Sequence, residues 1–215
     1  QVLRADTVAR QISVGIPAVR SISDHRFPFT PEGAGMLVDK GFCVRMESGA
    51  AAHIHYGDDA YARHGVEICT RSETLGADIV VCLGQLDTLD ARMVKRGALL
   101  LTMVRSAVKD REALAILLRR HVIALGLENL TDAGGNRPFA DIIHEIDGRA
   151  AMAVASSLLA DAVHGKGILL GGVAGVVPCE VTITGSDVAA CAAARTALGL
   201  GAIVRMFDNN VYKLR

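Results

Sequence analysis

A chain of 215 residues can hold one full domain and part of a second. Its 23 Lys and Arg residues balance 23 Asp and Glu residues, so its charge gives no reason to expect a nucleic acid or an anionic membrane as a partner. No apolar stretch is long enough for a membrane span and no signal peptide is recognisable, so we expect a cytoplasmic protein.

Apolar runs and helical segments alternate along residues 12–128. The helix expected at 31–40 has a clear start and end, because Thr30 can cap it, Pro31 suits its first position and Gly41 stops it. Strands that recur about every 20 residues with helices between them are typical of a parallel sheet with right-handed crossovers. The expected strands are 12–16, 42–47, 66–70, 79–83, 98–104 and 122–128, and the other expected helices are 58–64, 89–96 and 110–120.

A turn-rich break, TDAGGNRP at 131–138, ends this alternation. Residues 139–164 predict one long helix, or two helices with a kink at Gly148, and a glycine-rich connector follows at 167–178. We therefore divide the chain into three parts: an N-terminal α/β domain at 12–138, a connecting helix and linker at 139–178, and the start of a nucleotide-binding domain at 179–215.

The last part predicts a strand, a tight turn, a helix, a strand and then an acid. Gly185 breaks the run 181–184, an Ala-rich helix covers 188–198, and Asp208 closes the strand 202–207. This order is typical of the opening of a dinucleotide-binding βαβ unit. Because the chain stops just after that second strand, we expect it to be a piece of a longer protein. The predicted fold is α/β: a parallel-sheet, Rossmann-like N-terminal domain followed by the opening βαβ of a second, truncated Rossmann NAD-binding domain.

The phosphate-binding fingerprint GxGxxG is altered to Gly185-Ser186-Asp187-Val188-Ala189-Ala190. The first glycine is kept, and alanine is commonly tolerated in the third position. Asp187 stands where the backbone must approach the pyrophosphate, and a carboxylate about 4 Å from a phosphate charge repels it by about 4 kcal/mol at an effective dielectric constant of 20. Asp187 can instead cap the following helix and take the donors that a phosphate would use.

Five segments carry a further signal when they are taken in chain order. They are VGIPAVRSISDHRFPFTPEGAGMLVDKGFCVRMESGA, ADIVVCLGQLD, GLENLTD, IHEIDG, and the stretch from GKGILLGGVAGVVPCEVTITG to GLGAIVRMFDNNVYKLR. Their ordered series resembles the alanine dehydrogenase and nicotinamide nucleotide transhydrogenase family over about residues 12–215. The resemblance implies an oligomeric enzyme of two α/β domains with the active site in the cleft between them. Dehydrogenase members interconvert L-alanine with pyruvate and ammonia by passing hydride to NAD, and transhydrogenase members move hydride between NADH and NADP.

The same resemblance implies roles for single residues. Arg26 matches the family's carboxylate-binding Arg, whose guanidinium fork pairs both carboxylate oxygens. The family's substrate-binding Lys corresponds to Gly84, and its catalytic His corresponds to Arg105, which can bind an anion but cannot exchange a proton. The positions expected to bind the cofactor are Gly185, Ser186, Val188 and Asp208, with Asp208 at the adenine ribose. Three of these residues also have a structural interpretation: a surface cation for Arg26, a sheet-edge cation for Arg105 and a turn residue for Asp208.

Two functions of different classes stay open. The first is an NAD-dependent amino-acid dehydrogenase of the alanine dehydrogenase type. The second is a non-catalytic paralogue that serves as a ligand-binding or regulatory module, because Gly84, Arg105 and Asp187 each remove or oppose one part of the mechanism. A changed substrate, with Arg105 binding a second anionic group, is a third interpretation. We expect a small amino-acid or keto-acid substrate, a homo-oligomer and no metal, since His53 and His55 lack an evident third ligand. We also expect this 215-residue piece to be inactive by itself.

Overall fold

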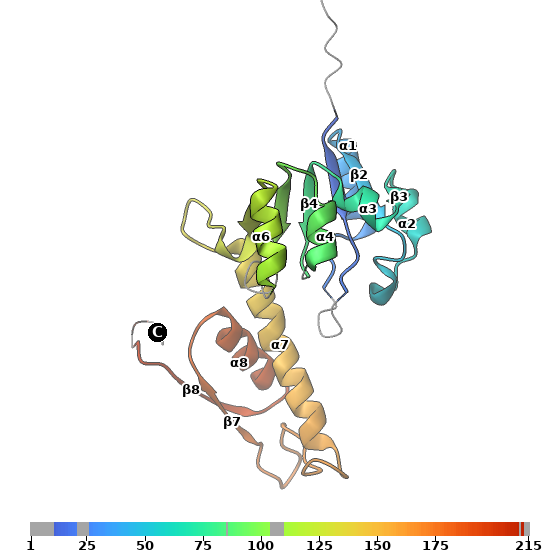
Figure 1. The fold of residues 1–215 in the computed structure, drawn as a ribbon. Coiled ribbons are helices and arrows are strands. Elements are labelled where there is room, and N and C mark those ends of the chain that lie inside the picture. Colours follow the sequence, from blue (N-terminus) through green and yellow to red (C-terminus); the bar gives the residue numbers. More distant parts are fainter. Residues whose placement is uncertain (1–10, 21–25, 85, 104–109, 211, 213–215) are drawn as a thin grey trace, which may run out of the picture. The chain divides into compact units, whose positions relative to one another are not determined.

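The computed structural model describes residues 11–20, 26–84, 86–103, 110–210 and 212. The chain divides into two compact units, Gln1–Glu128 and Asn129–Arg215. Figure 1 shows a parallel sheet with helices in the first unit, and a long helix with a shorter one and two strands in the second. The α/β class with a Rossmann-like sheet is therefore confirmed.

The first unit is built on a six-stranded parallel sheet in the order β3-β2-β1-β4-β5-β6. The six strands predicted for this unit are all present, and each is shorter than expected. They are β1 (Ser13–Ile16), β2 (Cys43–Glu47), β3 (Glu67–Cys69), β4 (Ile79–Cys82), β5 (Leu99–Thr102) and β6 (Ile123–Gly126). The chain moves outward from β1 to β3 and then returns to pair β4 with the other side of β1. The sheet therefore has a topological switch point between β1 and β4, and open α/β sheets bind ligands at the carboxyl ends of the strands there.

Helices cover both faces of this sheet, because right-handed crossovers that run in opposite directions from β1 fall on opposite faces. They are α1 (Pro31–Asp39), α2 (Asp58–Ala62), α3 (Arg71–Leu75), α4 (Thr88–Met93) and α6 (Arg111–Arg119), with short 3-10 turns η1 (Ala52–Ile54) and η2 (Leu127–Asn129). As predicted, Thr30 caps α1, and its side chain accepts a hydrogen bond from the amide of Gly33. Two buried clusters hold the layers together, one around Ile16, Met46 and Tyr61 and one around Leu75, Val80 and Leu100.

The second unit pairs one long helix with a βαβ element. Helix α7 (Pro138–Ala160) is followed by β7 (Glu180–Thr184), α8 (Val188–Gly199) and β8 (Ile203–Phe207), and the two strands are parallel. Helix α7 is continuous through Gly148, where a side chain would collide with α8: a Cβ there would lie 2.1 Å from the carbonyl oxygen of Ala189. The helix ends before the predicted residue 164, because the Asp161 side chain accepts hydrogen bonds from the amides of Val163 and His164.

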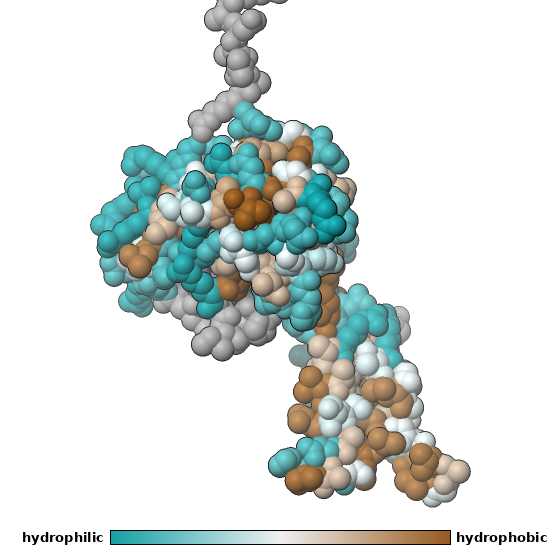
Figure 2. Space-filling view, turned by 90° about the vertical axis from the view of Figure 1, so that its right-hand side faces the viewer, coloured by the Kyte–Doolittle hydropathy of each residue, from teal (hydrophilic) through white to brown (hydrophobic). Residues whose placement is uncertain are grey.

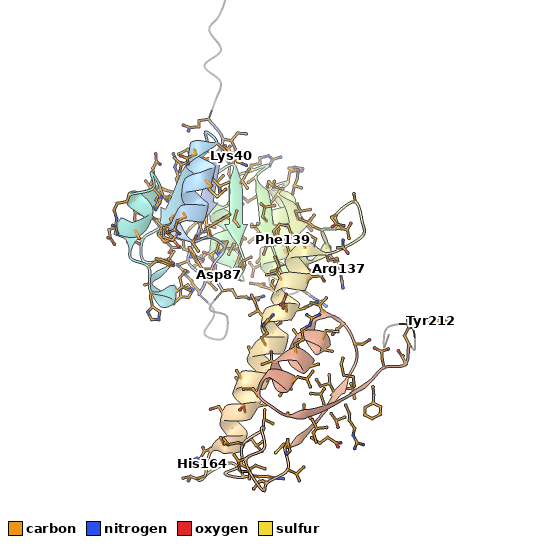
Figure 3. The ribbon with its side chains drawn as sticks, turned by 180° about the vertical axis from the view of Figure 1, so that it is seen from behind. Lys40, Asp87, Arg137, Phe139, His164 and Tyr212 are labelled. Atoms are coloured by element: carbon orange, nitrogen blue, oxygen red, sulfur yellow. The ribbon has the colours of Figure 1, made fainter. Side chains whose placement is uncertain are left out.

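Helix α7 carries large apolar side chains that remain exposed. They are Phe139, Ile142, Ile146, Val154 and Leu158. Figure 2 shows one face of the second unit, on which many apolar residues are exposed. Figure 3 labels Phe139 near the start of α7. Within the described residues, no helix is both long and apolar enough to span a bilayer.

Candidate functional site

The turn after β7 has the backbone shape that a nucleotide-binding unit needs. Gly185 has a φ of +108°, a conformation that side chains with a Cβ rarely adopt, and its amide donates a 2.7 Å hydrogen bond to the carbonyl oxygen of Phe207 on β8. The first glycine of the fingerprint is therefore required by the turn itself. Ser186 follows it, and Val188 is the first residue of α8.

Asp187 caps α8. Its backbone is extended, and its Oδ1 accepts a 3.0 Å hydrogen bond from the amide of Ala190. The carboxylate thus occupies the helix end where free amides and the helix dipole would otherwise attract a phosphate. The alternative that the sequence offered for Asp187, a helix cap, is what the side chain does.

The turn and the end of β8 are joined by one side-chain hydrogen bond. The hydroxyl of Ser186 donates to Oδ2 of Asp208 at 2.6 Å, and Oδ1 of Asp208 accepts from the amide of Asn210 at 2.7 Å. A pocket of about 370 Å³ opens beside them, lined by Thr184, Gly185, Phe207, Asp208 and Asn209. Three of the predicted cofactor positions, Gly185, Ser186 and Asp208, therefore lie together at the carboxyl ends of β7 and β8.

These residues suit only one end of a dinucleotide. A strand-end carboxylate beside a shallow pocket is suited to hydrogen bonds from a ribose diol, and Asp208 has that placement. The pyrophosphate position is opposed by Asp187, whose negative charge and cap take both the space and a donor that a phosphate would need.

At the switch point of the first unit, Gly84 stands where the family resemblance implies a substrate-binding lysine. A Cβ built on Gly84 would lie 2.7 Å from Cγ1 of Val19, so Val19 fills the space into which a side chain at position 84 would extend. Arg26 lies within the part of the chain that the structure describes, and it is partly buried. Arg105 and Gln85 lie outside the described residues.

Sequence reasoning missed a buried ion network at this same edge of the sheet. It consists of Glu47 at the end of β2, Arg71 at the start of α3 and Asp90 in the first turn of α4. The one available signal was local: Thr70 and Glu73 form a capping box that starts α3. Asp87, which is labelled in Figure 3, caps α4 in the same way. Nothing in the linear sequence, however, indicates that residues 47, 71 and 90 come together.

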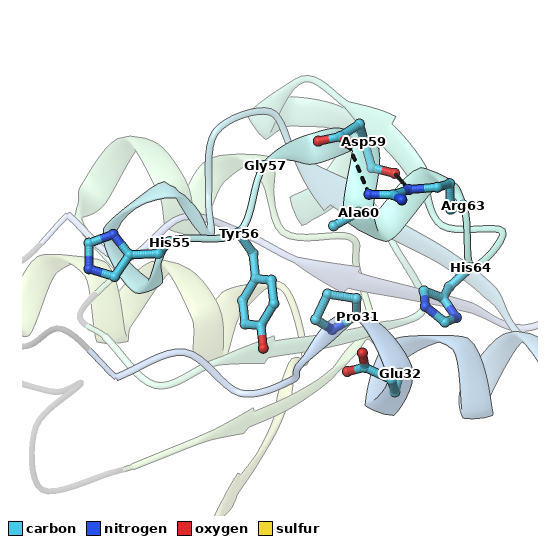
Figure 4. A pocket seen from close by; sticks show the side chains of 9 residues that line it. All are labelled: Pro31, Glu32, His55, Tyr56, Gly57, Asp59, Ala60, Arg63 and His64. Atoms are coloured by element: carbon cyan, nitrogen blue, oxygen red, sulfur yellow. Dashed lines mark hydrogen bonds and ion pairs between the residues drawn. The ribbon is translucent and has the colours of Figure 1, made fainter.

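A second pocket, of about 440 Å³, lies between α1, α2 and the loop that precedes α2 (Figure 4). Its lining carries charges of both signs, including Glu32, and Arg63 is already paired with Asp59 at 3.1 Å. Of the HxH pair, His53 packs edge-on against the ring of Phe27 and His55 lines this pocket. In the described part of the chain, no three His, Cys, Asp or Glu side chains are grouped to hold a metal ion.

Comparisons with known proteins match most of the chain. The model of the alanine dehydrogenase/PNT N-terminal domain matches residues 15–140, and the model of the C-terminal domain matches residues 151–215. The alanine dehydrogenase of Geobacillus stearothermophilus is 31% identical over 206 residues, which are 95% of this chain and 55% of that protein. That of Bilophila wadsworthia is 30% identical over 203 residues, which are 94% and 54%.

A solved structure of an L-alanine dehydrogenase matches the fold with a TM-score of 0.85 at 27% identity, over 94% of this chain and 56% of that one. The chain thus spans about half the length of the curated relatives it matches.

Proposed function

Because this chain belongs to the alanine dehydrogenase/PNT family, we propose that it is part of an alanine dehydrogenase-like oxidoreductase that acts on a small amino acid or keto acid. The observation that carries this proposal is the match of both family domains, in order, to one chain whose fold agrees with an L-alanine dehydrogenase. The reaction proposed for the full-length protein is oxidation of L-alanine to pyruvate and ammonia with NAD. The three-part division at residues 138 and 178 also stays a prediction.

We assign the binding roles as the sequence suggested them. Arg26 would pair with the substrate carboxylate, because a guanidinium can donate two parallel hydrogen bonds to its two oxygens. Gly185, Ser186, Val188 and Asp208 would form the nucleotide site. Arg105, at the family's His position, would serve as an anion-binding cation rather than as an acid or base.

A second candidate is a non-catalytic member of the family that binds a ligand or regulates a partner. Two local observations favour it. Asp187 caps the helix end that a pyrophosphate would use, and Val19 fills the space beside Gly84. Each feature removes a different part of the family reaction, so together they support loss of catalysis more strongly than either does alone.

We further propose that the full-length protein is a homo-oligomer located in the cytoplasm. The exposed apolar residues along α7 support the first part, because a contiguous apolar surface on a soluble domain commonly marks an interaction site. The cytoplasmic location rests only on the sequence and stays a prediction.

The deciding experiment is a fluorescence titration of NADH into the full-length protein, in three forms: wild type, Asp187→Gly and Asp187→Asn. The Asn variant keeps a capping oxygen and removes the charge, whereas the Gly variant removes both. Asp110→Gly is the matched control, because Asp110 caps α6 in the first unit in the same way.

Saturable binding by the wild type, followed by turnover of L-alanine, is the result expected for the oxidoreductase. Binding only after substitution of Asp187, with no gain in the Asp110 control, would support the non-catalytic candidate. Failure of every form to bind would contradict the oxidoreductase outright.

A further inference from the structure

The ion network at the carboxyl edge of the first sheet is almost completely buried. The side chains of Arg71, Glu47 and Asp90 are only 9%, 16% and 2% exposed. Charged groups are rarely buried so deeply unless they are paired, because removing them from water is costly. A buried network of this kind gives little net stability compared with apolar residues of the same volume, so its presence calls for another explanation.

Arg71 uses its guanidinium as a fork. Its Nε and Nη2 donate to the two oxygens of Asp90, both at 2.6 Å, and its Nη1 donates to Oε2 of Glu47 at 2.7 Å. This bidentate geometry fixes direction as well as distance, and a lysine ammonium could not reproduce it. Burial alone would raise the pKa of Asp90, but the hydrogen bonds and charge of Arg71 outweigh burial and hold that pKa below its usual range.

The same network holds the backbone of Ala18 from both sides. The Ala18 amide donates to Oε2 of Glu47 at 2.8 Å, and its carbonyl oxygen accepts from Nη1 of Arg71 at 3.0 Å. Ala18 belongs to the segment 17–20 that leaves β1, the central strand at the switch point. The network therefore ties together the chain that follows β1, the end of β2 and the starts of α3 and α4.

Holding Ala18 also fixes its neighbour. Val19 comes next in the chain, and its Cγ1 occupies the space beside Gly84. Arg20 then places Nη1 at 3.9 Å from Asp87 and 4.0 Å from Asp90, both longer than a hydrogen bond. The conformation of this segment thus decides which side chains lie at the carboxyl ends of β1 and β4.

We propose that Arg71 is a positioning residue, which clamps Ala18 through Glu47 and Asp90 so that the segment 17–20 holds one conformation over the switch point. The proposal rests on the proposed function in one respect, namely that the small amino-acid or keto-acid substrate binds near this switch point. Arg71 itself has no part in contacting that substrate, because its donors are already directed at Asp90, Glu47 and Ala18.

The test is hydrogen–deuterium exchange on the full-length protein carrying Arg71→Lys, which keeps the charge and loses the fork. Glu47→Gln is a milder second variant, in case Arg71→Lys fails to fold. Arg45→Lys is the matched control, because Arg45 pairs with Glu67 across β2 and β3 and is not among the side chains that hold Ala18. We expect amide exchange of residues 18–20 to rise by about tenfold or more in the first two variants, while α6 and the control stay at the wild-type rate.

The same variants are then titrated with L-alanine and with pyruvate. Where the wild type binds either, we expect the Kd to rise about 10- to 100-fold in Arg71→Lys and to stay unchanged in Arg45→Lys, because a misplaced binding segment is costly. Unchanged exchange at residues 18–20, or an equal rise throughout the sheet, would overturn the clamp. Raised local exchange with unchanged affinity would overturn its role in binding. A wild type that binds neither compound would refute the proposed substrate class, and the exchange data would still decide the clamp.

Discussion

Val19 and Gly84 meet at the one place in the first unit where the family resemblance predicted a side chain and the sequence supplies none. The glycine at position 84 and the valine at position 19 fit together, because a Cβ at position 84 would come within 2.7 Å of Val19 Cγ1. Restoring a side chain at position 84 therefore requires a change at position 19.

We expect Gly84→Ala to destabilise the full-length protein by about 1–3 kcal/mol through this overlap. Val19→Ala removes Cγ1 and with it the overlap. The double variant Val19→Ala/Gly84→Ala should therefore lose less free energy of unfolding than the two single variants lose together. Urea unfolding of the four proteins gives the coupling energy. Additive effects would mean that the two residues do not compete for this space.

Arg71 shows where inference from a sequence stops. Its position at the start of a short helix could be foreseen from the capping residues Thr70 and Glu73, but a charged residue just after a cap is usually solvated. Its burial depends on Glu47, at the end of β2, and on Asp90, in the first turn of α4, and only the packed fold brings these residues together.

Helix packing in the second unit depends on the absence of a side chain at Gly148. In an exposed helix, Gly→Ala gains about 1 kcal/mol, because it restricts the unfolded chain. At Gly148 the new methyl group would lie 2.1 Å from the carbonyl oxygen of Ala189, so α7 and α8 would have to separate.

The same substitution should therefore have opposite signs at two helical glycines. We expect Gly148→Ala to lower the midpoint of thermal unfolding. Gly33→Ala in α1 should leave it unchanged or raise it, because a Cβ there meets its nearest neighbour at an ordinary 3.5 Å. Calorimetry of the two variants measures both. A stabilising Gly148→Ala would show that α7 and α8 pack less closely than described.

At the level of elements, the sequence predicted most strands and helices, because their apolar runs are continuous and their ends carry strong signals such as Thr30, Pro31 and Gly41. It missed α3, a helix of five residues that starts almost directly after β3. The end of β6 was also placed too late, because Leu127, the last apolar residue of the run, already begins the 3-10 helix Leu127–Asn129.

For the molecule as a whole, Asp78 links the two central strands of the first sheet. It forms an ion pair with Lys95 and accepts hydrogen bonds from the amide and hydroxyl of Ser13, at 3.0 and 2.8 Å. The hydrogen bonds from Lys95 and Ser13 hold the pKa of Asp78 well below its usual range.

Because the pKa of Asp78 is lower in the folded state than in the unfolded state, its contribution to stability is full above about pH 4 and is lost as the pH falls below that value. We expect Asp78→Asn to lower the free energy of unfolding at pH 7 and to weaken its decline between about pH 4 and pH 2. Urea unfolding at several pH values measures this, with the exposed Asp59→Asn as control. Equal acid sensitivity of Asp78→Asn and the wild type would contradict the assignment.

The strand order also determines when each strand can pair while the ribosome synthesises the chain. β1 is made first, yet one of its two neighbours is β4, and Ser13 must wait for Asp78, 65 residues later, to complete its hydrogen bonds. Pairing between such distant segments is slow, because the entropy cost of closing the intervening loop comes before any favourable contact forms. Until β4 has left the exit tunnel, one edge of the central strand stays open in the nascent chain. This interval is when a chaperone would have most to protect.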